Sequence, residues 1–280
     1  MGAFGDLNRI GTNIQALQSL NSLNKINNQL GVRQLRLATG KRINSAEDDA
    51  AGFVIGRNLQ ARSKGLATAL NNVGDAKSLL SIAEGGLNNI LDILETMKEK
   101  ATQAASDTLG SSERNAIEDE LDALAAEIDD IVTETTFNGA SLLTSVNKTI
   151  QTGAETTDTL VISVTSQSHT AGALTVDDAN ITVSSSSFAS DALSKINTAI
   201  TTVKNSIASI GSYQSRLTTK ESTLSTAITN TEASRSRIVD ADFAKEQLES
   251  LKLQILQQTA SASLTQANAA PQVVLSLFGG

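Results

Sequence analysis

The feature that most constrains this 280-residue sequence is a long heptad pattern of apolar residues. From residue 73 onward, apolar residues follow one another at alternating spacings of three and four: Val73, Ala76, Leu80, Ala83, Leu87, Ile90, Leu94, Met97, Ala101 and Ala104. This spacing places all the side chains on one face of an α-helix and favours lengthwise pairing with another helix. The sequence therefore predicts a protein that is mainly α.

Two further apolar patterns indicate the partners of this helix. A short one follows Gly110 and contains Ile117, Leu121, Leu124, Ile128 and Ile131, and a long one contains Leu193, Ile196, Ile200, Val203, Ile207, Ile210, Leu217, Leu224, Ile228 and Ile238. Helices over residues 66–105 and 191–239 would be about 60 and 70 Å long at roughly 1.5 Å per residue. A compact domain of this size is only about 40–50 Å across. We therefore expect an elongated antiparallel helical rod, or coiled coil, with a third helix over residues 112–135.

The pattern changes between residues 136 and 190. The sequence TTFNG at residues 135–139 is a turn signal. Residues 160–164, 173–176 and 180–183 are short segments rich in β-branched residues and bounded by Gly, Asp and Ser, as is typical of strands. We expect a small β-hairpin patch on the rod.

Both ends of the chain carry apolar residues on more than one helical face. The first end contains Leu7, Ile10, Ile14, Leu17, Leu20, Leu23, Ile26 and Leu30, and the last contains Ala241, Ala244, Leu248, Leu251 and Ile255, with Leu253 and Leu256 on a second face. Such a helix needs more than one neighbour. We expect both ends to be frayed in the isolated chain and to become ordered when copies assemble. The residues predicted to make the assembly contacts are Leu7, Ile10, Ile14, Leu17, Leu248, Leu251, Ile255 and Leu277.

Composition argues against most other classes of function. The chain has no Cys, which excludes disulfides, cysteine zinc sites and thiol nucleophiles. Its one His, His169, lies in a Ser/Thr-rich stretch and is expected in a solvated loop. A net charge of −8 disfavours nucleic acid as a partner, and no run of about 18 apolar residues indicates a membrane span. We expect no catalytic residue, no metal and no cofactor, and neither a nucleic-acid nor a membrane partner.

Two local motifs have structural interpretations. The acidic run Glu47, Asp48 and Asp49 follows Ser45, which predicts a helix N-cap with acids in the first turn in place of a cation site. Gly85 and Gly86 lie within the long heptad pattern, where they permit either a close approach of helices or a bend.

Longer motifs at both ends carry a family resemblance. Residues 42–52 (RINSAEDDAAG) resemble the N-terminal signature of bacterial flagellin, and residues 236–246 (SRIVDADFAKE), 254–258 (QILQQ) and 266–278 (QANAAPQVVLSLF) resemble its C-terminal signature. TTFNG followed by two leucines resembles the turn that leads from the helical rod of that family into its β-hairpin. The similarity covers nearly the whole chain.

The resemblance implies a structural subunit that polymerises into the flagellar filament, a motility propeller, without catalysis. Residues 1–44 with 240–280 would form the terminal coiled coil of the inner tube. Residues 45–239 would form the rod with its β patch. Rods stacked along the filament would shift slightly between packings, which would let the filament supercoil. Larger relatives insert surface domains where this chain has residues 177–188, so it resembles a minimal, two-domain form.

The resemblance also implies partners and a location. The partners are copies of the chain itself in a helical homopolymer, the flagellar export apparatus and its chaperone, and the filament cap and hook-junction proteins. The filament would lie outside the cell, or in the periplasm if the host is a spirochaete. Some relatives are recognised by an innate immune receptor through an Arg, a Leu and a Glu. Glu120 matches that Glu, whereas Thr96 and Lys100 stand at the positions of the Arg and the Leu, which predicts weak recognition.

Other functions stay open at this point. A hook–filament junction protein of the same family would have similar ends but would not polymerise extensively. An enzyme carried on a filament would need a metal-binding His pair, and His169 is the one histidine. A soluble coiled-coil scaffold would form small oligomers.

Overall fold

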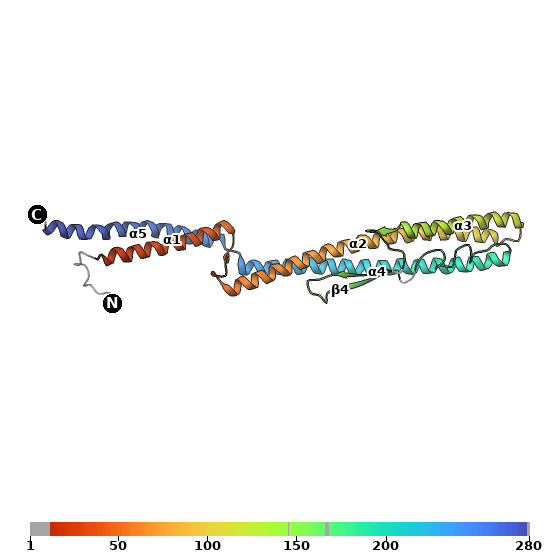
Figure 1. Cartoon of the computed structure of the whole chain (residues 1–280), viewed down its shortest axis with the longest axis horizontal. Helices are drawn as coiled ribbons and strands as arrows, with labels where there is room; N and C mark the ends of the chain where they lie inside the picture. Colours follow the sequence, from red (N-terminus) through yellow and green to blue (C-terminus); the bar gives the residue numbers. More distant parts are fainter. Residues whose placement is uncertain (1–11, 145, 166–167, 279–280) are drawn as a thin grey trace. The chain divides into compact units, whose positions relative to one another are not determined.

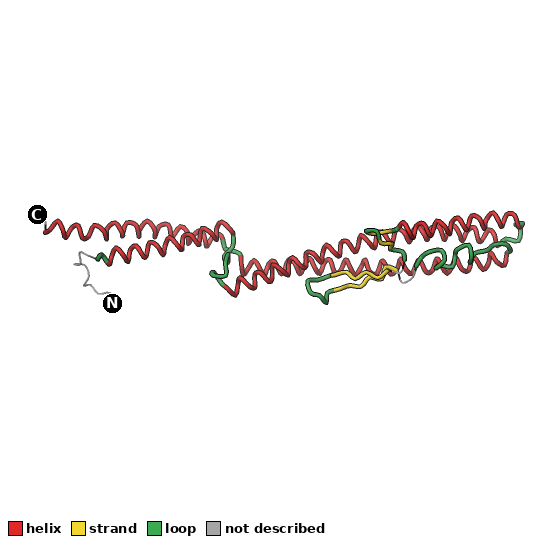
Figure 2. Tube along the Cα trace, in the orientation of Figure 1, coloured by secondary structure: helices red, strands yellow, loops and turns green. Residues whose placement is uncertain are grey.

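The computed structural model describes residues 12–144, 146–165 and 168–278. Five helices and four short strands follow one another in these residues (Figures 1 and 2). They are α1 (Ile14–Thr39), α2 (Ala50–Ala104), α3 (Ser111–Glu134), β1 (Thr136–Phe137), β2 (Ala140–Ser141), β3 (Val146–Gln151), β4 (Thr159–Thr165), α4 (Ser186–Val239) and α5 (Phe243–Phe278). A mainly α protein with β-hairpins is therefore confirmed. Among the described helices, none is long and apolar enough to cross a membrane.

The chain divides into two compact units. The terminal unit comprises Met1–Ala61 and Thr231–Gly280, and the central unit comprises Arg62–Asn230. Both long helices, α2 and α4, contribute residues to each unit. The predicted domain boundaries after residue 44 and before residue 240 stay a prediction.

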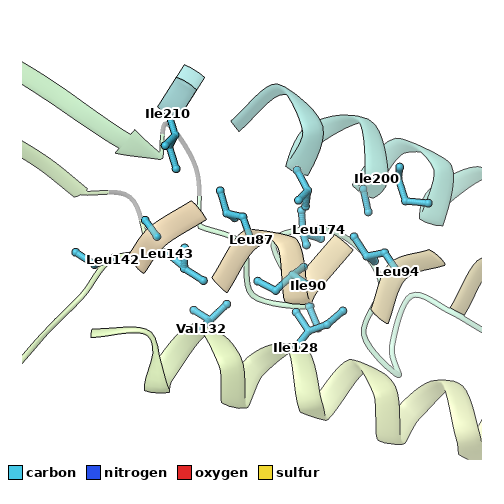
Figure 3. Packing of buried hydrophobic residues seen from close by; sticks show 14 of the residues in the cluster. Leu87, Ile90, Leu94, Ile128, Val132, Leu142, Leu143, Leu174, Ile200 and Ile210 are labelled. Carbon is cyan, nitrogen blue, oxygen red and sulfur yellow. The ribbon is translucent and has the colours of Figure 1, made fainter. Parts of the chain in front are cut away.

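The core of the central unit is the apolar seam predicted from the sequence. All ten predicted positions of the long heptad pattern on α2, from Val73 to Ala104, are buried. They pack against buried residues of α3 and α4. Figure 3 shows Leu87, Ile90 and Leu94 of α2 near Ile128 of α3 and Ile200 of α4. Burying one such Leu side chain stabilises a fold by about 1.5–3 kcal/mol. The seam is thus the main source of stability in this unit.

Polar pairs at the edge of the seam show the relative direction of the two long helices. Lys77 Nζ of α2 lies 2.7 Å from Glu221 Oε2 of α4, and Gln214 Nε2 of α4 donates to Glu84 Oε2 of α2 at 2.7 Å. As the residue number rises on α2 it falls on α4, so the two helices are antiparallel, as predicted.

Two hairpins follow α3, and one of them confirms the turn signal. In the β1–β2 hairpin, Asn138 and Gly139 have φ angles of 50° and 76°, which a tight two-residue turn requires. The β3–β4 hairpin contains the predicted strand at residues 160–164 and pairs Leu160 with Ile150. Ile162 of β4 is buried, whereas Val161 points outward, as the alternation of a strand demands.

The predicted strands at residues 173–176 and 180–183 are wrong. Residues 168–185 form an irregular segment, which we call the strap, along the central unit. Turns within the strap pair several of its backbone N–H groups with carbonyls three to five residues earlier, as in Leu174 N to the Thr170 carbonyl at 3.0 Å. Two further N–H groups reach α3: Ala171 N donates to Asp129 Oδ1 at 2.8 Å and Val183 N donates to Glu118 Oε2 at 3.2 Å. Local turns, together with these two carboxylates, replace the partner strand that the β-branched residues had suggested.

His169 of the strap is buried, so the expectation of a solvated loop is also wrong. Its Nε2 lies 2.9 Å from Ser206 Oγ of α4, and its backbone N–H donates to the Leu143 carbonyl at 3.0 Å. The imidazole is thus a core residue that ties the strap to α4.

The N-terminus of α2 differs from the prediction by one helical turn. The helix begins at Ala50, and Asp49, not Ser45, is its cap, because Asp49 Oδ1 accepts a hydrogen bond from Gly52 N at 2.9 Å. Asp48 instead closes the preceding turn by accepting from the backbone N–H groups of Asn44 and Ser45, both at 3.0 Å.

Candidate assembly surface

In the terminal unit, α1 and α5 form an antiparallel pair. Asn13 Nδ2 donates to the Ala267 carbonyl at 2.7 Å, and Gln257 Nε2 donates to Asn27 Oδ1 at 2.8 Å. In the part of α5 whose side chains the structure describes, buried and half-buried residues recur at alternating spacings of four and three: Glu246, Ser250, Leu253, Gln257, Ala260, Leu264 and Ala267. This inward face, which we call the pairing seam, is a heptad face with several polar members.

A buried ionic group holds one end of the pairing seam. The carboxylate of Glu246 is 5% exposed and accepts from Arg33 Nη1 of α1 at 3.0 and 2.8 Å. Arg36 lies 3.6 Å from Glu246 Oε1 and 3.3 Å from Asp48 Oδ1, so it joins α5 to the turn before α2. The backbone N–H groups of Asn44 and Ser45, and then Arg36, hold the pKa of Asp48 below its usual value.

Apolar stripes gave no indication of this ionic group. The signal in the sequence is the charge of the two ends, which is positive over residues 1–44 and negative over residues 240–280. Three of the charges that make this difference are Arg33, Arg36 and Glu246, and the structure brings them together.

Four of the residues predicted to make assembly contacts, Leu17, Leu248, Leu251 and Ile255, lie away from the pairing seam. Leu17 of α1 is 52% exposed, and on α5 the exposed fractions are 69% for Leu248 and 63% for Ile255. Leu251 is also exposed, and Ile14 is half-buried. Leu7, Ile10 and the side chain of Leu277 lie outside the described residues.

Further apolar side chains extend this exposed surface beyond the predicted set. Leu20, Val32 and Leu35 of α1 and Phe243 and Leu256 of α5 are all exposed. We call the exposed apolar residues of α1 and α5 together the outer face. Exposed apolar side chains in this number are typical of surfaces that contact other molecules.

The three positions compared with a receptor motif lie on the central unit. Lys100 of α2 forms an ion pair with Glu120 of α3, with Nζ 2.7 Å from Oε1. Thr96 is exposed, and its hydroxyl donates to the Asp92 carbonyl at 3.0 Å. The Glu that matches the motif is therefore bonded within the chain.

Antiparallel pairs of long helices define the class of the protein: a mainly α-helical protein of the coiled-coil type. Comparisons with known proteins agree. Residues 10–148 match the profile of the bacterial flagellin N-terminal helical region, and residues 193–278 match that of the C-terminal helical region.

Two flagellins are similar along the whole chain. The flagellin of Halalkalibacterium halodurans is 34% identical over 275 residues, which cover 96% of this chain and 99% of that protein. The flagellin of Bacillus subtilis is 34% identical over 304 aligned positions with the same coverage. The chain belongs to the bacterial flagellin family.

Membership of this family defines the function. The protein is a structural subunit of the flagellar filament, not an enzyme, and it polymerises with copies of itself outside the cell. Among solved structures, a putative flagellar hook-associated protein from Vibrio parahaemolyticus has a TM-score of 0.56 at 15% identity, covering 69% of this chain and 100% of that one. That likeness concerns the fold alone.

Proposed function

We propose that the outer face of α1 and α5 is the surface through which copies of this chain polymerise. The carrying observation is that Leu17, Leu248 and Ile255 are exposed, away from a pairing seam that is itself partly polar. Each copy would bury these side chains against its neighbours, so the stability of the filament would be a sum over many modest contacts. Leu7, Ile10, Ile14, Leu251 and Leu277 complete the proposed set.

The proposal also assigns different roles in the filament to the ends and to the middle of the chain. Residues 1–44 with 240–280 would line the inner tube, and residues 45–239 would form the rod. Backbone hydrogen bonds near both proposed boundaries support this division. Arg42 N donates to the Val239 carbonyl at 2.7 Å, and Ala241 N donates to the Gly40 carbonyl at 2.9 Å. These bonds pair the segment that ends α1 with the segment that precedes α5.

The remaining partners follow from the family. The export apparatus and its chaperone would handle the chain before assembly, and the filament cap and hook-junction proteins would contact it at the ends of the filament. If the host is a spirochaete, the filament would lie in the periplasm.

A charge placed on the outer face tests the proposal. Leu248→Asp should leave the circular dichroism spectrum of the dilute chain unchanged, because its side chain is exposed. It should raise the critical concentration for seeded polymerisation at least about tenfold, since burial of one Leu is worth about 1.5–3 kcal/mol. Gln254→Asp, an exposed residue of the same helix, is the control of equal charge and should polymerise like the unaltered chain.

The same assay separates the alternatives. If Leu248→Asp polymerised normally, the outer face would not be the assembly surface. A deletion of residues 1–30 that still formed filaments would contradict the proposal as well. If the unaltered chain folded but electron microscopy of seeded samples showed no extended polymer, the hook–filament junction protein would be the better assignment.

Recognition by the innate receptor is proposed to be weak. The support is that Thr96 and Lys100 differ from the motif and that Lys100 pairs with Glu120. The double variant Thr96→Arg with Lys100→Leu restores the motif and frees the carboxylate. It should give a stronger reporter-cell response than the unaltered monomer, and an equally strong response from both would refute the proposal.

A further inference from the structure

The terminal unit contains a hollow that its own side chains do not fill. It has a volume of about 340 Å³ and lies where the segment after α1 meets the start of α2 and the end of α4. Its apolar lining comes from Ile43, Phe53 and Val239, of which Ile43 and Val239 are buried. Gly56 makes room for Val239, because a Cβ at this glycine would lie 2.5 Å from Val239 Cγ2.

Three cations line the same hollow, and two of them lack a counterion among the described residues. Arg235 is paired with Glu232 at 2.8 Å and lies 3.8 Å from Asp240. Lys41 and Arg57 are exposed, and neither forms an ion pair with a residue that the structure describes. An apolar floor with two such cations at its rim fits a partner that presents carboxylates from a short apolar or helical surface.

The chain itself offers such a partner in α3. This helix contains nine acidic residues and one arginine. Glu127, Asp130 and Glu134 are exposed at spacings of three and four, so they form a ridge on one face, turned away from the buried Ile128. We call these three residues the acidic ridge, and none of them has an ion pair within the described part of the chain.

The position of the acidic ridge is unfavourable for an isolated helix. Like charges three and four residues apart repel each other. Asp130 and Glu134 also lie near the C-terminus of α3, where the helix dipole disfavours anions, and the last turn has no basic residue. A cationic partner would offset both effects.

We propose that the hollow lined by Lys41 and Arg57 receives the acidic ridge of α3 from a second copy of this chain. The two surfaces belong to different units of opposite charge, since the terminal unit has eleven basic and nine acidic residues and the central unit has eleven and twenty-one. Contact between copies is a property that this protein requires as a filament subunit, and the inference rests on that function. The contact adds direction to the assembly, because each copy presents both the hollow and the ridge.

Charge reversal on each surface separately tests this contact. The hollow variant carries Lys41→Glu and Arg57→Glu, and the ridge variant carries Glu127→Lys and Glu134→Lys. Alone, each variant places like charges opposite each other. Each should therefore raise the critical concentration for seeded polymerisation about tenfold, the effect of turning two exposed attractions into repulsions.

Mixing the two variants in equal amounts restores the complementary charges. The altered hollow of one variant then faces the altered ridge of the other, and the two unaltered surfaces face each other as well. The mixture should polymerise nearly as well as the unaltered chain, with the two variants alternating.

Matched controls keep folding and net charge out of the result. Lys64→Glu with Lys220→Glu has the net charge of the hollow variant, and Glu99→Lys with Asp191→Lys has that of the ridge variant; all four positions are exposed. These pairs should polymerise normally, and all variants should show the circular dichroism spectrum of the unaltered chain. If the hollow variant polymerised normally, or if the mixture failed to recover, the contact would be refuted. Failure of the outer-face proposal would appear separately, as normal polymerisation of Leu248→Asp.

Discussion

Gly85 and Gly86 are adjacent in α2, but we expect an alanine at each position to change stability in opposite directions. A Cβ added to Gly86 would lie 2.7 Å from Thr135 Oγ1 and 2.9 Å from Leu143 Cδ1, whereas a Cβ at Gly85 would meet nothing within 4 Å. Of the two roles expected for this pair, a close approach is therefore the role of Gly86. Both residues lie inside the helix, so alanine favours the folded backbone at each position by about 0.5–1 kcal/mol.

The two substitutions should consequently shift stability in opposite directions. Gly85→Ala should raise the free energy of unfolding of the central unit by about 0.5–1 kcal/mol. Gly86→Ala gains the same amount but overfills the core, which costs about 1–3 kcal/mol. We therefore expect a net loss of about 1–2 kcal/mol, or a melting temperature lower by roughly 2–8 °C.

Urea unfolding measures both effects in the unit concerned. The chain has one tyrosine, Tyr213, which lies on α4 against the core of the central unit, and no tryptophan. Its fluorescence therefore reports on this unit, and circular dichroism follows the helices. Equal shifts for Gly85→Ala and Gly86→Ala, or a more stable Gly86→Ala, would refute the close-approach argument.

Three further substitutions test single contacts. Leu253→Ala opens a cavity in the pairing seam and should destabilise the folded terminal unit by about 2–4 kcal/mol, measured as a lower urea concentration for unfolding of preformed filaments. Ser206→Ala removes the hydroxyl bonded to His169 Nε2 and should cost the central unit about 1–2 kcal/mol in a thermal melt. Burial, and then the charge of Asp178, raises the pKa of Asp122 above 3.8, so ionisation of Asp122 opposes folding as the pH rises through that raised value. Asp122→Asn should stabilise the central unit at neutral pH by about a few tenths of a kcal/mol and leave it unchanged at a pH below about 3, as melts at both pH values would show. A variant that unfolds like the unaltered chain would contradict the contact that it tests; for Asp122→Asn this holds for the melt at neutral pH.

The long helices could be predicted because their cause is local in sequence. Apolar spacing of three and four residues specifies one buried face, and on α2 every position from Val73 to Ala104 that carried the pattern is buried. The turn at Asn138 and Gly139 was predictable for a similar reason, since a tight turn with positive φ favours these residue types.

The strap could not be predicted because its structure depends on residues far away in the chain. β-Branched residues at 173–176 and 180–183 favour strands in general, but no neighbouring strand among the described residues is available to them. Turns within the strap bond most of these backbone N–H groups, and Asp129 and Glu118 of distant α3 accept those of Ala171 and Val183. For His169, polarity and a Ser/Thr-rich neighbourhood suggested solvent, whereas Ser206 supplies the partner that permits burial.

The candidate site was predictable in part. Apolar residues on two faces of α5 correctly indicated that some side chains would stay exposed, and Leu248, Leu251 and Ile255 are exposed. The stripe did not show which face α1 would cover. Polar residues such as Glu246 hold positions of the pairing seam, and their role becomes visible only when Arg33 is placed opposite.

The antiparallel pairing of α1 and α5 determines how the terminal unit responds to mechanical force. Asn13 and Ala267 are bonded to each other, so the start of α1 is held against the later part of α5. A pull that separates the start of α1 from α5 breaks the contacts between the two helices one after another. The load is therefore never shared by all of these contacts at once. The first contacts to open are those farthest from the Arg33–Glu246 ion pair, and the last are that ion pair and the backbone bonds that join residues 40–42 to residues 239–241.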